Sequence, residues 1–188
     1  MTETTGRNSS AELEQLLTLI QGASGRAALR PYLSDPDPDV RRTAVEVVAR
    51  QRPEWGFDAL CLALLDASDS VRVAAVEALR PLEPEFPDQP QLFDFLEQAL
   101  ASPSVPVREI AVRLLRRTSD ASVSTFVVAA RDDEPSVRRE AVRGLADLGA
   151  VSEIGTLIED DDPDVRAAAV AAIATASPSG LSRNELTD

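Results

Sequence analysis

The chain has 188 residues and a formal net charge of −13, with 44% hydrophobic but only 4% aromatic residues. This length allows one domain with its own core or a short repeat array, and the scarcity of aromatic residues favours close-packed helices over a β-sandwich. All 19 basic residues are arginine, and the absence of histidine excludes histidine-based acid–base catalysis, nucleophile pairs and metal ligation. One cysteine excludes internal disulfides, iron–sulfur clusters and cysteine zinc sites.

The first twenty residues combine a polar start with an amphipathic segment. Residues 1–8 contain no apolar signal-peptide core, so we expect a disordered tail and a cytoplasmic protein. Leu13, Leu16, Leu17 and Ile20 share one helical face and predict a capping helix before the repeats that follow. No apolar run reaches the roughly 18–20 residues that a membrane span needs, so we expect no membrane partner.

One pattern then recurs five times: an acidic or Ser/Pro-rich turn, Val-Arg, and Ala-Val three and four residues after the arginine. An aliphatic residue follows seven residues after the arginine in every copy. The pattern arginines are Arg41, Arg72, Arg108, Arg138 and Arg166. Their spacings of 31, 36, 30 and 28 residues are typical of helical repeat arrays.

Each copy predicts two helices. The Val-Arg segment is the second helix, because a capping Asp or Ser and a nearby proline precede apolar positions at helical spacing. First helices are predicted at 27–33, 55–65, 91–100, 123–131 and 151–158. The sequence therefore predicts an all-α fold, a right-handed α-solenoid of about five helix pairs in a repeat domain at 9–176. A flexible tail is expected at 177–188.

These copies resemble the HEAT repeat, in particular the short phycobilisome-lyase-like type with its D-P-x-V-R-x-x-A core, and the resemblance covers about residues 29–176. An arginine at the edge of a buried face needs a carboxylate, and an aspartate lies six residues before most of the pattern arginines. The resemblance likewise implies an Asp–Arg ladder, within or between repeats. Its members are Asp35, Arg41, Asp66, Arg72, Arg108, Asp132, Arg138, Asp160 and Arg166. Ser102 replaces the aspartate of the third copy, so the contact should be weaker or missing there.

Asp35, Asp37, Asp39 and Glu46 match the acidic positions of a calcium-binding loop. The position that requires glycine is Val40, and prolines stiffen the loop. We interpret these acids as helix caps and predict no metal site.

The remaining features are assigned to packing. Cys61 is expected to be a small core residue, and Trp55 and Phe57 to pack in the core or at its edge. Residues 81–90 contain four prolines, explain the long 36-residue spacing and predict a rigid loop. A binding role for that loop stays open.

Eight further arginines lie on the predicted second helices, between roughly 180° and 280° from the repeat valine and thus opposite the buried face. They are Arg42, Arg50, Arg80, Arg113, Arg116, Arg117, Arg139 and Arg143. In a HEAT-like solenoid the second helices line the concave surface, so the resemblance implies an arginine stripe there. The alternative is a solvated face with local pairs to Glu46, Glu77, Glu109 and Glu140.

The sequence thus favours a non-catalytic interaction module or scaffold, without cofactor or catalytic residues. It would bind an acidic protein or peptide on its concave arginine-lined surface, and a homodimer through the Ala-rich last helix is a further hypothesis. One alternative is a subunit of a bilin-lyase-like enzyme; the iron site of the HEAT-like deoxyhypusine hydroxylases needs histidine and cannot be carried over. The other is DNA binding, as in HEAT-like alkylpurine glycosylases, which the acidic charge disfavours.

Overall fold

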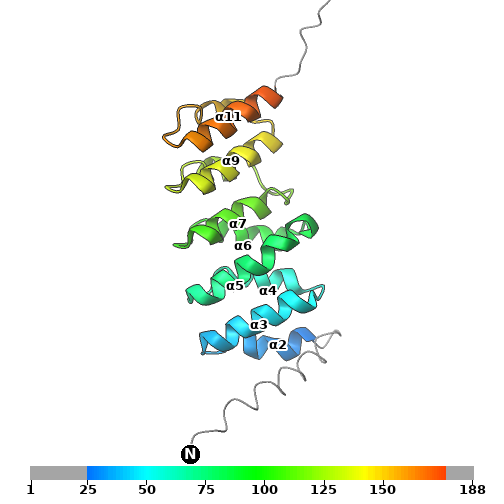
Figure 1. Cartoon of the computed structure of the whole chain (residues 1–188). Coiled ribbons are helices and arrows are strands. Elements are labelled where there is room, and N and C mark those ends of the chain that lie inside the picture. Colours follow the sequence, from blue (N-terminus) through cyan, green and yellow to red (C-terminus); the bar gives the residue numbers. More distant parts are fainter. Residues whose placement is uncertain (1–24, 177–188) are drawn as a thin grey trace, which may run out of the picture. The chain divides into compact units, whose positions relative to one another are not determined.

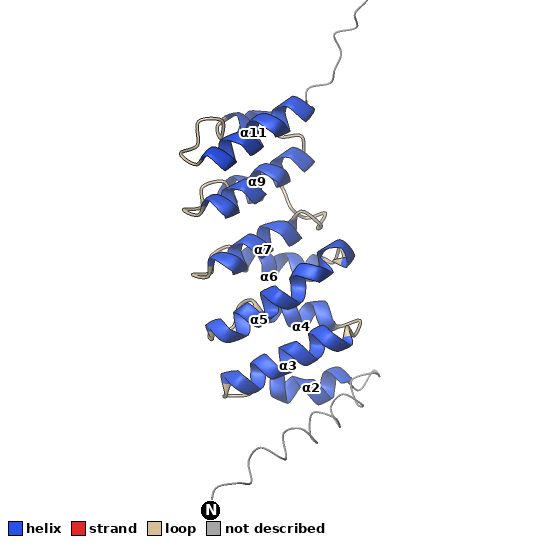
Figure 2. Cartoon of the chain, in the orientation of Figure 1, coloured by secondary structure: helices blue, strands red, loops and turns tan. Residues whose placement is uncertain are grey.

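The computed structural model describes residues 25–176, where it contains ten α-helices, one 3₁₀ helix and no strand (Figures 1 and 2). The prediction of an all-α fold is confirmed. The predicted capping helix and both predicted tails lie outside the described residues.

The helices alternate as five pairs. The first helices are α2 (Gly25–Leu33), α4 (Gly56–Ala63), α6 (Pro90–Ala99), α8 (Val123–Ala129) and α10 (Val151–Gly155). The second helices are α3 (Pro38–Gln51), α5 (Asp69–Leu79), α7 (Val105–Leu115), α9 (Pro135–Asp147) and α11 (Pro163–Ala176). The proline-rich loop contains the 3₁₀ helix η1 (Arg80–Glu85). This repetition of helix pairs is the α-solenoid architecture.

The chain divides into two compact units, Met1–Ser119 and Asp120–Asp188, called the first and second unit below. In the first unit, α3 packs against α5 and α5 against α7, while α4 packs against α6 behind them (Figure 1). The second helices therefore form one layer and the first helices another. In the second unit, α9 packs against both α8 and α11.

The repeat residues build the core. The alanines three residues after each pattern arginine are all buried, because small side chains let neighbouring helices approach closely. The valines one position later are buried in the first four pairs. Val170, the equivalent valine of α11, is 57% exposed, since no further helix pair covers it within the described residues.

A single glycine shows how tight this packing is. A Cβ added at Gly144 on α9 would collide with the ring of Phe126 on α8, which is itself buried. Glycine is therefore needed at this position for the close approach of the two helices.

Candidate partner-binding surface

The Asp–Arg ladder is built from three-part contacts. Arg41 donates from Nε and Nη2 to the two carboxylate oxygens of Asp66, both at 2.8 Å, and from Nη1 to the backbone carbonyl of Asp35 at 2.7 Å. Arg138 does the same with Asp160, at 2.8 and 2.7 Å, and with the carbonyl of Asp132 at 2.8 Å. Each of these arginines thus joins the turn of its own pair to the turn of the next.

The hydrogen bonds from the arginines favour the ionised form of the two aspartates. The Arg41 guanidinium lowers the pKa of Asp66, and the Arg138 guanidinium lowers the pKa of Asp160. The pKa values of both arginines are raised in turn by the same bonds. Bidentate pairs of this kind are strong and geometrically specific, so these groups hold the array together.

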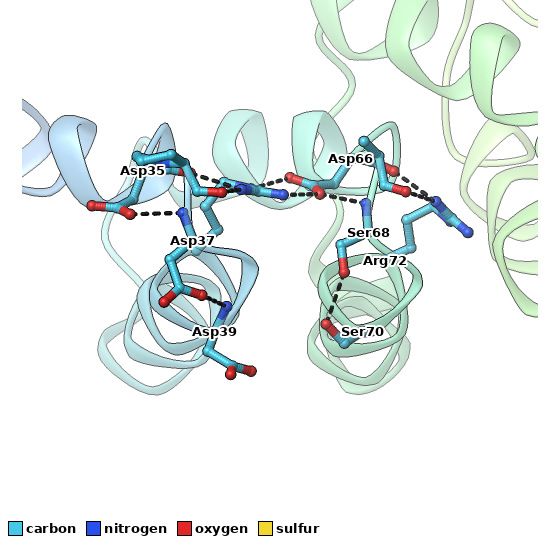
Figure 3. Close-up of polar contacts among 10 residues, drawn as sticks. Asp35, Asp37, Asp39, Asp66, Ser68, Ser70 and Arg72 are labelled. Carbon is cyan, nitrogen blue, oxygen red and sulfur yellow. Dashed lines mark hydrogen bonds and ion pairs between the residues drawn. The ribbon is translucent and has the colours of Figure 1, made fainter.

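The ladder has a gap at Arg72. Its Nη1 donates to the Asp66 carbonyl at 2.8 Å (Figure 3). Its Nη2 pairs with Asp69 at 3.0 Å on its own helix. Its Nε is buried without an acceptor. Ser102 stands where the next aspartate would be, and Arg108 donates to its backbone carbonyl at 3.0 Å.

The acids of the first turn cap backbone N–H groups at the start of α3. An oxygen of Asp35 accepts from the backbone N–H of Asp37 at 2.8 Å, and one of Asp37 accepts from that of Asp39 at 2.9 Å (Figure 3). These bonds support our interpretation of the acids as caps. No cluster of metal-ligating side chains occurs among residues 25–176.

Five of the eight predicted partner-binding arginines contact acids of the chain itself. In the first unit, Arg42 pairs with Glu46 at 2.6 Å, while Arg113 and Arg117 both face Glu83 of η1, the former in direct contact and the latter at 3.8 Å. The remaining pairs are Arg139–Asp164 and Arg143–Glu140 in the second unit. Much of the predicted stripe is therefore locally neutralised.

The other three differ in exposure. Arg116 is half-buried and has contacts of its own. Arg50 and Arg80 are exposed and make no ion pair within the described residues. Of the predicted cluster, Arg113, Arg116 and Arg117 belong to the first unit, whereas Arg139 and Arg143 belong to the second.

Arg143 has a structural partner. It contacts Glu140, which is 4% exposed although it is a carboxylate. Removing Arg143 would leave a buried carboxylate without this pair, so Arg143 is a poor choice for testing binding.

A depression of about 330 Å³ lies between α3 and α5. Its lining includes Arg50 and Arg52 together with Glu46 and Glu77. Arg52 ends α3 in the left-handed region, with φ of 46°, and lies 3.6 Å from Glu85. This left-handed conformation at Arg52 directs the chain toward Glu85, and the repeat pattern in the sequence does not predict it.

Glu83 was also not among the site residues predicted from the sequence. It lies in the proline-rich loop, 30 residues before Arg113 in the sequence, and is only 13% exposed at its side chain. Only the fold brings this loop back onto α7. Its carboxylate shows how Arg113 and Arg117 can hold an acidic group between them.

Comparison with known proteins places these features in context. The profile of HEAT repeats matches residues 11–85 and 93–174. No curated protein matches the chain. None of the described helices combines the length and the apolar character needed to cross a bilayer.

Several solved structures share the fold. A designed armadillo repeat protein in complex with the peptide (KR)4 has a TM-score of 0.59 at 18% identity, over 92% of this chain and 95% of that one. YibA of Escherichia coli has a TM-score of 0.59 at 15% identity, over 92% and 76%. Human deoxyhypusine hydroxylase has a TM-score of 0.50 at 18% identity, over 89% and 74%.

Proposed function

Because this chain belongs to the HEAT-repeat family, we propose that it is a non-catalytic module that binds a protein or peptide partner carrying acidic groups. Arrays of helical repeats offer extended surfaces for such partners. The designed armadillo neighbour holds a peptide, which supports the same mode of use. The phycobilisome-lyase-like type and a cytoplasmic location remain predictions.

The observation that carries this proposal is the pair Arg50 and Arg80. Both are exposed and unpaired within the described residues, and Arg50 lines the depression between α3 and α5. An arginine fork can bind a carboxylate through two hydrogen bonds, as Arg41 binds Asp66. In a chain with a net charge of −13, Arg50 at the depression and the exposed Arg80 give local complementarity to an acidic partner.

The test uses two synthetic peptides, (Asp-Glu)4 and (Lys-Arg)4, at about 0.15 M salt, where charges farther apart than about 8 Å are largely screened. We expect (Asp-Glu)4 to bind and the Arg50→Gln/Arg80→Gln variant to lose at least tenfold in affinity. The matched control is Arg131→Gln, which removes one exposed arginine elsewhere and is compared with the single variants Arg50→Gln and Arg80→Gln. Tighter binding of (Lys-Arg)4, unchanged in the Arg50 variant, would show that the acidic turns bind partners instead.

The alternatives give different results. A bilin-lyase-like subunit should bind a bilin and change its absorbance spectrum. A DNA-binding protein should shift duplex DNA in a gel and lose the shift with added salt.

We further propose that α11 carries a contact with a second copy of this chain. The helix has no charged residue after Arg166, and only Val165 and Ala169 are buried. Val170 is 57% exposed, whereas the equivalent Val142 of α9 is 1% exposed. A helix with no charge along one side is usually covered by a neighbour. An uncharged surface of this kind is complementary to itself.

Sedimentation across a range of protein concentrations tests this contact. We expect a concentration-dependent dimer that Val170→Glu converts to a monomer. Val128→Glu is the control, since Val128 is 64% exposed on α8 in the same unit. A monomer at every concentration, or a dimer that persists in Val170→Glu, would contradict the contact.

A further inference from the structure

A hollow of the first unit lies among the first helices, and none of the eight stripe arginines lines it. This first-helix groove has a volume of about 630 Å³ and is lined mainly from α2, α4 and α6, with Val45 of α3 and Val71 of α5. Pockets that bind small molecules or peptide side chains commonly measure about 300–1,000 Å³. The groove is therefore large enough to take several side chains of a bound segment.

The walls of the groove are mainly apolar. Leu33, Trp55, Leu62 and Phe95 line it, and the buried Val45 closes part of its floor. Leu62 is 56% exposed although its side chain is large and apolar. Large apolar side chains left exposed around a hollow are typical of binding sites. The groove thus offers a place for a bulky apolar side chain.

The polar groups of the groove are unevenly paired. Asp58 lies 3.3 Å from Arg26, and Asp66 is occupied by Arg41. Arg30 is exposed at the groove and has no ion pair within the described residues. The indole N–H of Trp55 is buried without an acceptor. After these pairs are made, Arg30 remains as an exposed cation without an ion pair within the described residues, so a ligand with carboxylate oxygens would complement the groove.

We propose that the first-helix groove binds a peptide segment in which a bulky apolar residue is flanked by Asp or Glu. The apolar side chain would pack against Leu62 and Phe95, and the neighbouring carboxylate would pair with Arg30. A peptide suits the groove better than a compact molecule, because the lining extends from α2 across α4 to α6. This site is separate from the α3–α5 depression, which holds Arg50.

Trp55 gives a direct readout, because it lines the groove and is the only tryptophan in the chain. The probe is a random heptapeptide display library, selected on the immobilised full chain. Peptides without tryptophan are then synthesised and titrated against the Trp55 emission. We expect enrichment of Leu, Ile or Phe beside Asp or Glu, and a saturable change in emission for the selected peptides.

Two variants assign the binding to the groove. Leu62→Lys and Arg30→Glu should each weaken the selected peptides at least tenfold. Val73→Lys and Arg131→Glu are the matched controls, since both residues are exposed and lie outside the groove. Arg50→Gln/Arg80→Gln should leave this binding intact, which separates the groove from the acidic-partner surface.

Three outcomes would overturn the proposal. In the first, the selection enriches no peptide that changes Trp55 emission. In the second, the selected peptides bind the Leu62→Lys variant as tightly as the parent. In the third, the enriched flanking residues are basic rather than acidic. A change in Trp55 emission with protein concentration alone would assign the groove to a second copy of the chain instead.

Discussion

Replacing Ser102 with aspartate should close the gap in the Asp–Arg ladder at Arg72. The equivalent Asp66 caps its own turn by accepting from the backbone N–H of Ser68 at 2.8 Å and also binds Arg41. Ser102 only caps, accepting from the N–H of Ser104 at 3.3 Å. An aspartate there can do both, because the carboxylate has a second oxygen and reaches farther than the hydroxyl.

The size of the effect follows from the unsatisfied donor. A buried N–H without an acceptor costs about 1–3 kcal/mol, and a hydrogen bond to a charged group contributes about 1.5–3 kcal/mol. Ordering and desolvating the new carboxylate offsets part of this gain. We expect a net stabilisation of about 1–2 kcal/mol. For a chain of this length that corresponds to a rise in Tm of about 2–8 °C.

Thermal and urea unfolding, followed by circular dichroism, measure the gain. Ser104→Asp is the control, since it adds the same charge at the N-cap of α7, where the helix dipole alone contributes about 0.3–1 kcal/mol. The gain at Ser102 should vanish when Arg72 is replaced by Met, which a double-mutant cycle tests. Equal gains from both aspartates, or a gain that survives without Arg72, would refute the ladder argument.

Four further predictions concern stability and the reactivity of the buried thiol. Because the pKa values of Asp66 and Asp160 are lowered in the folded state, their contribution to stability should be present above about pH 4 and lost as the pH falls below it; Asp→Asn at both sites should flatten the Tm against pH in that range. Gly144→Ala should lower the free energy of unfolding by about 1–3 kcal/mol in urea melts, because its methyl group meets the Phe126 ring; an unchanged midpoint would mean that the ring moves freely. Burial raises the pKa of Cys61 to about 12, so the thiol should resist a disulfide reagent at pH 8 until urea unfolds the chain. Raising salt from about 0.1 M, where the Debye length is about 10 Å, should raise Tm by screening the net charge of −13, and a falling Tm would mean that ion pairs outweigh repulsion.

The helix pairs could be predicted because their signal is local. Spacing places Ala44 and Val45 on the buried face of α3, and the same offsets recur in each copy. The same local rule cannot report that Val170 is exposed, because its burial depends on whether another pair follows it. Periodicity predicts which face is apolar, whereas the neighbour decides whether that face is covered.

The candidate site was less accessible from sequence because its contacts join distant segments. The stripe was predicted from helical angles, and Arg50 and Arg80 are indeed exposed. The contact of Glu83 with Arg113 requires the proline-rich loop to fold back over 30 residues, and no spacing rule encodes that path. The first-helix groove likewise depends on the packing of several helices, so its residues, such as Phe95, carry no local signature.

The Arg41–Asp66 contact also bears on how such a chain can change in length. One helix pair supplies the arginine and the next supplies the aspartate. The contact between two neighbouring pairs, here called a junction, therefore needs one donor and one acceptor, and every pair can carry both. A pair duplicated or removed between two junctions would bring or take away one donor and one acceptor together. Arg166 donates to the backbone carbonyls of Asp160 and Asp161 and meets no following aspartate within the described residues. A sixth pair with an aspartate at its turn would therefore find the donor half of its junction already positioned.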